Sequence, residues 1–500
     1  FTILLRYICP CMKKKVSIIG SGFSSLAAAC YLSKFGFEVH VFEKNSMVGG
    51  RAARLKIKGF TFDIGPTWYW MPDIFENFFS DFSKSPQDYY SLERLDPSYE
   101  VYFGKKDSIK LEDSFEKRCD QFEAIEKGSK KKLETFISEA KTNYKIAIGE
   151  VVYKMYGNSF FELITINTIK KIKYFFTSIK RQVVKNFKNP NLTQILQFPV
   201  LFLGAKPSAT PAFYNFMSYA DFGLGTWHPK NGMYSVVLGI EKLAKELGVK
   251  FHLNSEVQKI LTKGNKASGV RVNEKDFFSD IVLSGADYVH SESLLDFKDR
   301  VYSEKYWKKK VFAPSALLFF IGFNKKIKNV SHHTLFFDAD FDKHARSIYD
   351  DPSWPIDPLI YTNFPSITDK SMAPKNKEAC TVLVPIAAGI EDTKELRKSY
   401  FELIIGRIEK LTEQSLKNDI LFHESYCIND FVNDYNSYKG NAYGLANTLM
   451  QTAFLRPKLK SKKIKKLYFS GQLTVPGPGV PPALISGKLS AELIRKEMNL

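Results

Sequence analysis

A strand, a glycine-rich turn and a helix near the start of the chain predict an α/β fold with a Rossmann-like domain. Residues 16–19 form an apolar run typical of a buried strand, and Gly20 and Gly22 follow it directly. Residues 24–36 are rich in small side chains and fit a helix, and residues 38–42 fit the next strand. Together they make one strand–helix–strand unit. Later segments add a discontinuous α+β domain and a basic helical region.

Length and composition bound the remaining possibilities. The 500 residues correspond to roughly three folding units. Apolar residues make up 44% of the chain and charged residues 25%, which excludes a long disordered chain. The formal net charge of +19 favours an anionic partner surface, either nucleic acid or lipid head groups. The 42 Phe and 25 Tyr favour an apolar ligand.

The cysteines and the first residues carry little information on function. The six cysteines are scattered without a CxxC pair, which argues against a disulfide framework. Cys9 and Cys11 form a lone CxC without further ligands nearby, so we expect no metal. Residues 1–11 precede Met12 and are expected to be upstream translated sequence rather than a signal peptide. No run of about 18 apolar residues, the length a membrane-spanning helix needs, occurs in the sequence.

Changes in composition divide the chain into segments of an α/β domain and of an inserted domain. Residues 112–224 are helical in character, with many Lys and aromatic residues and several prolines. A loop, a helix over 235–248 and a strand then follow, which is the alternation of helix and strand typical of an α/β domain. Aromatic strands and a helix over 395–416 mark a second inserted stretch. The predicted segments are 12–111, 225–290 and 426–500 for the α/β domain, and 112–224 and 291–425 for the inserted domain.

The turn after the first strand fits a dinucleotide site. Glycines at 20 and 22 let the backbone turn tightly and approach a pyrophosphate at the helix N-terminus, with Ser25 in place of the usual third glycine. Glu43 ends the next strand, where a carboxylate would meet the ribose hydroxyls of an adenine dinucleotide. Taken alone, the glycine motif also fits an ordinary strand-to-helix turn.

Two further motifs indicate which dinucleotide is bound. Gly49-Gly50-Arg51 follows Glu43, and residues 62–67 read Phe-Asp-Ile-Gly-Pro-Thr. This arrangement resembles the GR2-type flavoprotein signature, in which the second glycine-rich turn and its arginine approach the FAD pyrophosphate. Near the other end of the chain, Gly471 follows a strand, and a Pro/Gly loop over 476–482 leads into a helix from about Ala483. The N-terminus of such a helix suits the N1/C2=O side of a reduced, anionic flavin.

The chain from Met12 resembles the bacterial-type phytoene desaturases, a family of FAD-dependent carotenoid desaturases. The stretches that carry the resemblance are FTFDIGPTWYWMPDIFE, FYNFMSYADFGLGTWHPKNGMYSVV, SGADYVHSE, APSALLFFIGFNKKI, DYNSYKGNAYGLANTLMQTAFLRPKL and LYFSGQLTVPGPGVPPALISG. The departures are Ser25, His228 where Tyr is common, and Asn231-Gly232 in place of a glycine pair. The resemblance implies FAD, bound by Gly20, Gly22, Phe23, Ser24, Glu43, Lys44, Gly50, Arg51, Gly65, Pro66, Thr67, Val257, Gly471, Gly477, Gly479 and Val480.

The resemblance also implies roles within this set. Glu43 would bind the adenosine ribose, Arg51 would lie by the pyrophosphate, and the backbone of Val257 would contact the adenine. Gly471 and residues 477–480 would line the flavin.

The implied desaturation removes a hydride from one allylic carbon to flavin N5 and a proton from its neighbour. The hydride needs only geometry and a dry pocket, but the proton needs a base or a cation-like carbon. No Ser/His/Asp or paired-carboxylate arrangement stands out in the sequence. The candidate catalytic residues are Asp221, His228 and Asp434, and a capping or turn role is the alternative for each.

A basic segment predicts contact with a membrane surface. Between Glu162 and Asp221 the sequence contains eight Lys or Arg residues and no acidic one. An apolar stripe at spacings of three and four fits a helix lying in an anionic interface, and residues 198–204 could insert beside it. A core-packing helix with a solvated Lys face is the alternative. The apolar stripe consists of Ile169, Ile172, Phe176, Ile179, Val183 and Phe187. A second basic group, the Lys cluster over 458–466, could add to the attraction or be solvated.

The leading hypothesis is a phytoene desaturase that introduces double bonds on FAD and passes electrons to oxygen or a membrane quinone. The expected location is cytoplasmic, on the inner face of the cell membrane. The alternatives are a desaturase or isomerase of another carotenoid, a non-enzymatic isoprenoid-lipid carrier on the same scaffold and, less favoured, a soluble amine oxidase. Nucleic acid is not an expected partner, because no nucleic-acid-binding motif accompanies the charge. The oligomeric state is left open.

Overall fold

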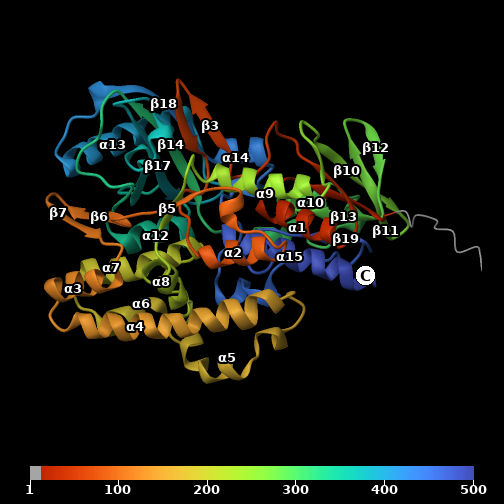
Figure 1. The fold of residues 1–500 in the computed structure, drawn as a ribbon, viewed down its shortest axis with the longest axis horizontal. Coiled ribbons are helices and arrows are strands. Elements are labelled where there is room, and N and C mark those ends of the chain that lie inside the picture. Colours follow the sequence, from red (N-terminus) through yellow and green to blue (C-terminus); the bar gives the residue numbers. More distant parts are fainter. Residues whose placement is uncertain (1–12, 500) are drawn as a thin grey trace, which may run out of the picture.

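Two main β-sheets and a layer of helices make up the computed structural model, which describes residues 13–499 (Figure 1). Residues 1–11, with Cys9 and Cys11, lie outside the described part. The four other cysteines, Cys30, Cys119, Cys380 and Cys427, are free and buried. Within residues 13–499, no helix is long and apolar enough to cross a bilayer.

The first main sheet is parallel throughout, with strand order β19-β13-β1-β2-β9. Helices pack against it, which explains why its strands are apolar runs rather than alternating patterns. The Cα of Gly487 lies so close to helix α1 that a Cβ would clash with the backbone oxygen of Ser24. The elements are β1 (Lys15–Ile19), β2 (Glu38–Phe42), β9 (Lys250–His252), β13 (Ile281–Ser284), β19 (Leu467–Phe469), α1 (Phe23–Lys34), α9 (Tyr234–Glu246) and α15 (Val480–Glu497).

The second main sheet is mixed and has the order β18-β14-β17-β16-β15-β6-β7. Alternate residues of strand β14 (Ser315–Phe323) face opposite sides: Phe319 packs towards helix α13 (Lys394–Thr412), and Phe320 packs towards Phe62. The other strands are β6 (Tyr99–Gly104), β7 (Asp107–Leu111), β15 (His333–Phe336), β16 (Ile360–Asn363), β17 (Glu378–Ile386) and β18 (Ile420–Tyr426). Strands β6 and β7, predicted as part of the first α/β segment, thus lie in this second sheet.

Smaller elements connect these sheets. An antiparallel sheet lies beside the first main sheet and consists of β10 (Val257–Lys263), β11 (Lys266–Val272) and β12 (Lys275–Phe278). Two strand pairs are formed by β3 (Arg54–Ile57) with β4 (Phe60–Asp63) and by β5 (Leu92–Arg94) with β8 (Trp227–Pro229). The remaining helices of this part are α2 (Pro72–Ser80), α10 (Tyr288–Ser293), α11 (Glu304–Lys308), α12 (Phe341–Tyr349) and α14 (Ile428–Tyr435).

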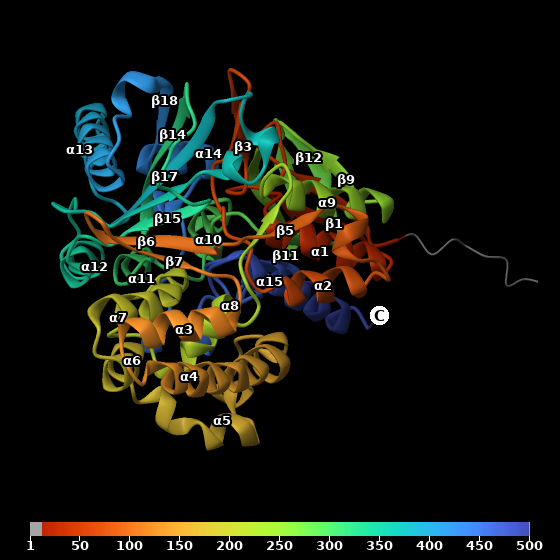
Figure 2. The same cartoon turned by 60° about the vertical axis from the view of Figure 1, so that its left-hand side comes forward.

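The helical layer lies below the second main sheet and below α2 and α15, and α5 lies at its outer edge in both views (Figures 1 and 2). The chain packs α4 against α3 and α8 and brings α6 against α7. The layer consists of α3 (Phe115–Ile125), α4 (Ser129–Tyr144), α5 (Ile166–Lys170), α6 (Ile179–Asn186), α7 (Pro190–Gln197) and α8 (Phe216–Phe222).

The structure corrects the predicted amphipathic stripe. The stripe is not one helix, because α5 ends at Lys170, a short 3₁₀ turn spans Ile172–Phe175, and α6 begins at Ile179. Its second half, Ile179, Val183 and Phe187, is completely buried, so the core-packing alternative holds there. Its first half, Ile169, Ile172 and Phe176, is 56%, 57% and 83% exposed. In the segment 198–204, Phe198 and Val200 are buried, so these two side chains do not insert beside the stripe.

Candidate active site

One large cavity of about 560 Å³ lies against both main sheets and the helical layer. The carboxyl ends of the parallel strands open into it: Gly20 follows β1, Glu43 follows β2, Gly285 follows β13 and Gly471 follows β19. In an open parallel sheet this edge is where ligands bind. The opposite part of the cavity is lined mainly by aromatic and aliphatic side chains.

The turn between β1 and α1 has room for a ligand next to its backbone. Gly20 has φ +82°, a left-handed conformation that favours glycine. Gly22 has an ordinary φ of −68°, and a Cβ built on it would meet no atom within 4 Å. The protein itself therefore does not require glycine at position 22, but a ligand close to this backbone would. The first turn of α1 carries no acidic residue, so its free N–H groups can receive an anion.

Glu43 is buried and fixed by its neighbours. One carboxylate oxygen accepts hydrogen bonds from Ser21 N and Ser21 Oγ at 2.9 and 2.7 Å, and the other accepts from Asn45 N at 2.9 Å. It lies on the cavity wall beside Lys44, Glu256 and Val257. These residues form the end of the cavity where the ribose and adenine of a dinucleotide would lie.

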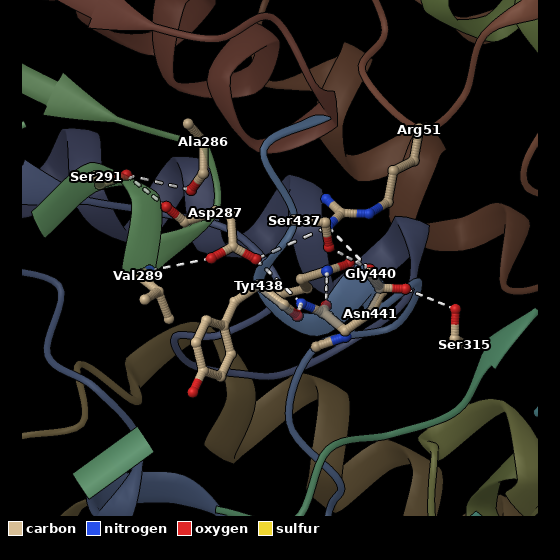
Figure 3. A network of polar contacts seen from close by, with 12 residues as sticks. Arg51, Ala286, Asp287, Val289, Ser291, Ser315, Ser437, Tyr438, Gly440 and Asn441 are labelled. Carbon is tan, nitrogen blue, oxygen red and sulfur yellow. Dashed lines mark hydrogen bonds and ion pairs between the residues drawn. The ribbon is translucent and has the colours of Figure 1, made fainter. Parts of the chain in front are cut away.

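Arg51 joins two distant parts of the chain, as Figure 3 shows. Its Nη2 donates to Ser437 Oγ at 2.8 Å and to the Asn441 carbonyl oxygen at 3.1 Å, and lies 3.9 Å from Asp287 Oδ2. Asn441 Nδ2 donates to the same Asp287 oxygen at 3.1 Å. Arg51 Nε is buried and has no partner among the described residues. An anion in the cavity would satisfy this N–H group.

Asp287 and Asn441 were not identified as site residues from the sequence. Both lie in stretches that carry the family resemblance, SGADYVHSE and DYNSYKGNAYG. Asp287 is buried and lines the cavity, and Val289 N donates to its Oδ1 at 3.0 Å, which caps helix α10. The signal was therefore present, but the role of Asp287 as counter-charge to Arg51 required the fold.

The predicted cofactor-binding residues converge on this cavity. Of the sixteen, Gly477 alone is absent from the cavity wall. Gly477 has φ +137°, and a Cβ on it would lie 3.1 Å from Asn447 Oδ1, so this glycine lets the loop pack against Asn447. Gly479, at the N-terminus of α15, does line the cavity, together with Val480. Asn231 and Gly232, a departure from the family pattern, have φ values of +67° and +86°, which Asn tolerates well.

Asp221 does not lie on the cavity wall. It is completely buried, and its carboxylate pairs with Arg118 Nη1 at 3.1 Å and accepts a hydrogen bond from Tyr99 OH at 2.6 Å. Both partners of the ion pair are fully enclosed, so removing either would leave an uncompensated charge. The structure therefore assigns Asp221 to the support of the helical layer, not to proton transfer.

His228 also lies behind the cavity wall. Its Nε2 is 3.4 Å from Asp369 Oδ2, and its ring centroid is 4.6 Å from that of His332. Burial alone would raise the pKa of Asp369, but hydrogen bonds from His228, Ser371 and Asn231 N together hold it below its usual value. His228 is thus part of a buried polar cluster and does not line the cavity in which a ligand would bind.

Asp434 lines the cavity at the nucleotide end. Its Oδ2 accepts a hydrogen bond from Tyr426 OH at 2.8 Å, and its carbonyl oxygen accepts one from Asn45 Nδ2 at 3.1 Å. This places it beside the residues around Glu43, far along the wall from the apolar part. A general base for a carotenoid would have to lie at the other end.

The apolar part of the cavity offers few titratable groups. His344 lines it, but its Nε2 donates to the Pro385 carbonyl oxygen at 2.7 Å and its Nδ1 accepts from Leu359 N at 2.9 Å. Burial lowers the pKa of His344 to about 4, so the ring is neutral and both nitrogens are occupied. The walls here include Trp70, Ile74, Ile148, Val151, Phe198, Phe213, Phe216, Met217, Phe337, Leu359 and Leu383.

The model of the family of flavin-containing amine oxidoreductases matches residues 23–495. The chain belongs to this family. Among its relatives, the chain is 39% identical to a carotenoid 3,4-desaturase of Haloarcula japonica, over 97% of this chain and 98% of the relative. It is 31% identical to a zeta-carotene-forming phytoene desaturase of Myxococcus xanthus, over 96% and 93%. These identities place it with the FAD-dependent carotenoid desaturases of the family, as the sequence predicts.

Two solved structures show the same fold at low identity. An oxidoreductase from Methanosarcina mazei has a TM-score of 0.62 and 17% identity, over 96% of this chain and 100% of that one. Putrescine oxidase bound to putrescine has a TM-score of 0.59 and 14% identity, over 97% and 99%. Both support the predicted Rossmann-like fold and add nothing on the substrate.

The residues of this flavin oxidoreductase fit its cofactor, FAD. The open space at Gly22, the unpaired Arg51 Nε and the acid-free N-termini of α1 and α15 all face one cavity. A pyrophosphate would supply the negative charge that Arg51 and the N-terminus of α1 can receive, the N-terminus of α15 would suit an anionic flavin, and Glu43 would supply the acceptor that ribose hydroxyls need. The chain is therefore an FAD-dependent oxidoreductase.

Proposed function

We propose that the protein desaturates a carotenoid within this cavity. The observation that carries the proposal is that a long apolar wall adjoins the predicted FAD-binding residues in one cavity, and that the described residues of its far part include no carboxylate or amine. An apolar pocket of this kind recognises a ligand by length and shape rather than by polar groups. The relatives named as carotenoid desaturases support the same substrate class.

When bound, FAD supplies a hydride acceptor. The glycine turn and Arg51 would hold it, Glu43 would orient it, and the N-terminus of α15 would meet its flavin part. The apolar wall would exclude water and position an allylic C–H for hydride loss. For reoxidation we propose oxygen or a membrane quinone.

Phytoene is the proposed substrate on the family resemblance, and a second candidate has specific support. The chain is 39% identical to the carotenoid 3,4-desaturase but 31% identical to the phytoene desaturase and 32% identical to a 4,4'-diapophytoene desaturase of Staphylococcus aureus. The higher identity favours a carotenoid that is already partly conjugated and that is desaturated near one end.

Incubation with each substrate separates the two candidates. The FAD-loaded protein is mixed with vesicles that contain either phytoene or lycopene, and products are separated by chromatography and identified by mass and visible absorption. Coloured products from phytoene support phytoene desaturation. Loss of two hydrogens from lycopene with a red shift, and no change in phytoene, supports end-group desaturation. If neither carotenoid changes although FAD is bound, the proposed function is wrong.

We propose that the substrate enters from a membrane through the segment 161–176. The inner side of this segment lines the cavity through Leu163, Thr168 and Phe175. Its outer side exposes apolar residues, with Phe161, Ile166 and Phe176 exposed by 78%, 75% and 83%. One thin layer of chain therefore separates the apolar cavity from an apolar outer surface. Large exposed side chains of this kind, rimmed by cations, are typical of a membrane-contacting surface.

The charge around this segment supports an anionic membrane. Lys170, Lys171 and Lys173 adjoin the exposed apolar residues, and no ion pair joins them to the described residues. Two other cations of the basic stretch are neutralised, because Lys180 pairs with Asp342 and Lys206 pairs with Asp350, each at 2.6 Å. The three lysines are thus the part of the basic stretch best placed to meet lipid head groups.

A further inference from the structure

A chain of hydrogen bonds leads from the cavity wall to a buried imidazole. Thr67 and Tyr361 both line the cavity, and Thr67 Oγ1 lies 2.7 Å from Tyr361 OH. Tyr361 OH lies 2.7 Å from His333 Nδ1. Thr67 follows the turn at Gly65, which packs so tightly on Arg51 that a Cβ at position 65 would clash with the Arg51 carbonyl oxygen. The chain therefore begins at the flavin end of the cavity.

The neighbouring groups fix the direction of these hydrogen bonds. Asn363 Nδ2, which can only donate, lies 3.4 Å from His333 Nδ1. His333 Nδ1 therefore accepts, and the ring proton is on Nε2, which is buried and has no partner among the described residues. Because Nδ1 accepts, Tyr361 must donate to it, and Thr67 must donate to Tyr361. The Tyr361 oxygen, on a residue of the cavity wall, then keeps one lone pair that neither Thr67 nor His333 uses.

We propose that Tyr361 and His333 receive the proton that desaturation releases; the proposal rests on the proposed function. Once one carbon has lost its hydride to the FAD that the cavity would hold, the C–H bond of the neighbouring carbon would break. Its electron pair becomes the new double bond, and its proton moves to the Tyr361 oxygen. The proton of Tyr361 passes at the same time to His333 Nδ1, which becomes imidazolium. Tyr361 is the catalytic residue, and His333 acts through it.

The surroundings of His333 suit this role. Burial, with a smaller effect of His228, holds the pKa of His333 well below its ordinary value, so the ring is neutral and ready to accept. A weak base suffices, because loss of the hydride leaves a cation-like carbon, and the C–H bonds of the carbon next to it are then strongly acidic. The indole of Trp68 is stacked on the ring at 3.9 Å and 9°, and an aromatic face stabilises a cation above it. The ring of His332 is also adjacent, at 4.6 Å, and its pKa is likewise lowered by burial.

Two substitutions test the relay. Tyr361→Phe removes the hydroxyl, and His333→Gln keeps an acceptor for Tyr361 that cannot be protonated. Since a positioned base contributes about 10²-fold or more, each should lower kcat by about 10²-fold with KM changed less than about threefold. Tyr102→Phe is the matched control, because it removes a hydroxyl from the same sheet. This hydroxyl donates to the Asn329 carbonyl oxygen at a distance of 2.6 Å, and Tyr102 does not line the cavity. The kcat of this variant should be unchanged.

Two readouts do not depend on turnover. The FAD content and the affinity of the dithionite-reduced enzyme for the carotenoid should be equal in parent and variants. In ¹⁵N spectra of histidine-labelled protein, His333 should show a bare Nδ1 and a protonated Nε2, and Tyr361→Phe should shift the Nδ1 signal. A protonated Nδ1 in the parent overturns the relay without any substrate. So does a kcat of Tyr361→Phe or of His333→Gln within threefold of the parent. Absence of any product from the parent would instead overturn the proposed function.

Discussion

At the scale of single residues, glycine 22 is informative because the protein around it does not need a glycine. Its φ is ordinary, and a side chain there would point into the cavity without touching the protein. We expect Gly22→Val to fold normally but to lose FAD, because the new side chain would occupy the position of the pyrophosphate. The measurement is the visible absorption of the purified protein together with its far-UV circular dichroism.

Gly406→Val is the matched control for this substitution. Gly406 lies in α13, and a Cβ there also meets nothing within 4 Å, but the site is far from the cavity wall. This variant should stay yellow. Full flavin content in Gly22→Val would contradict the cofactor site described above. Glu43→Ala is also expected to lose FAD, but it is a less clean test, because it leaves the buried N–H groups of Ser21 and Asn45 without their acceptor.

Asp63 gives the protein a pH-dependent stability. It is buried and accepts hydrogen bonds from Met233 N and Tyr234 N at the start of α9. Burial is the main cause that raises its pKa from 3.8 to about 6. A carboxyl whose pKa is raised in the folded state contributes stability that is complete below its unfolded pKa and is lost as the pH rises through its folded pKa.

Replacement of Asp63 by Asn removes this titration. A shift of two pKa units corresponds to about 3 kcal/mol. The parent loses this stability between about pH 4 and pH 7 and Asp63→Asn does not, so the free energy of unfolding of the variant minus that of the parent should rise by up to about 3 kcal/mol over this range. The measurement is denaturant unfolding at a series of pH values. A difference between the two proteins that stays constant over this range would show that Asp63 does not titrate as described.

At the scale of elements, the segment 166–187 shows how one periodic pattern can serve two purposes. The breaks between α5, the 3₁₀ turn and α6 rotate successive parts of the chain, so Ile179, Val183 and Phe187 enter the core while Ile169, Ile172 and Phe176 face outward. A continuous helix would have kept all six on one face. Only the outward half, with its lysines, is available to a membrane.

Substitution of the three unpaired lysines tests this element. Lys170→Gln, Lys171→Gln and Lys173→Gln together should weaken binding to phosphatidylglycerol-containing vesicles by on the order of 100-fold, at about 1 kcal/mol per cation near an anionic surface. Co-sedimentation at low salt is the measurement. The effect should disappear with neutral phosphatidylcholine vesicles.

The charge-matched control lies outside the segment 161–176, directly before β19. Lys462, Lys463 and Lys465 precede β19 and are exposed, and they belong to a predicted basic cluster in which Lys460 pairs with Glu497 at 2.6 Å. Their joint replacement by Gln changes the net charge equally and should leave vesicle binding nearly intact. Equal losses in both triple variants would mean that general charge, rather than the segment 161–176, attracts the membrane.

At the scale of the whole molecule, the parallel sheet brings the ends of the chain to one ligand. Strand β1 lies between β2 and β13, and β19 lies beyond β13, so the turns after these strands share one edge. Residues 20–24, 43–45, 49–51, 285–287, 471–473 and 478–480 thereby line one cavity. The helical layer and the second sheet complete the apolar walls. No single segment could bind FAD or enclose a carotenoid alone.

Local motifs and the family resemblance were enough to predict FAD and the strand–helix–strand unit of residues 16–42, because glycine turns, a strand-terminal carboxylate and an apolar run impose their geometry locally. Which polar residues face the cavity depended instead on the packing of distant segments. Asp221 is neutralised by Arg118, 103 residues away, and Thr67 meets Tyr361 across 294 residues. Burial and partners of such groups depend on contacts between distant segments, and a pattern of neighbouring residues does not contain them.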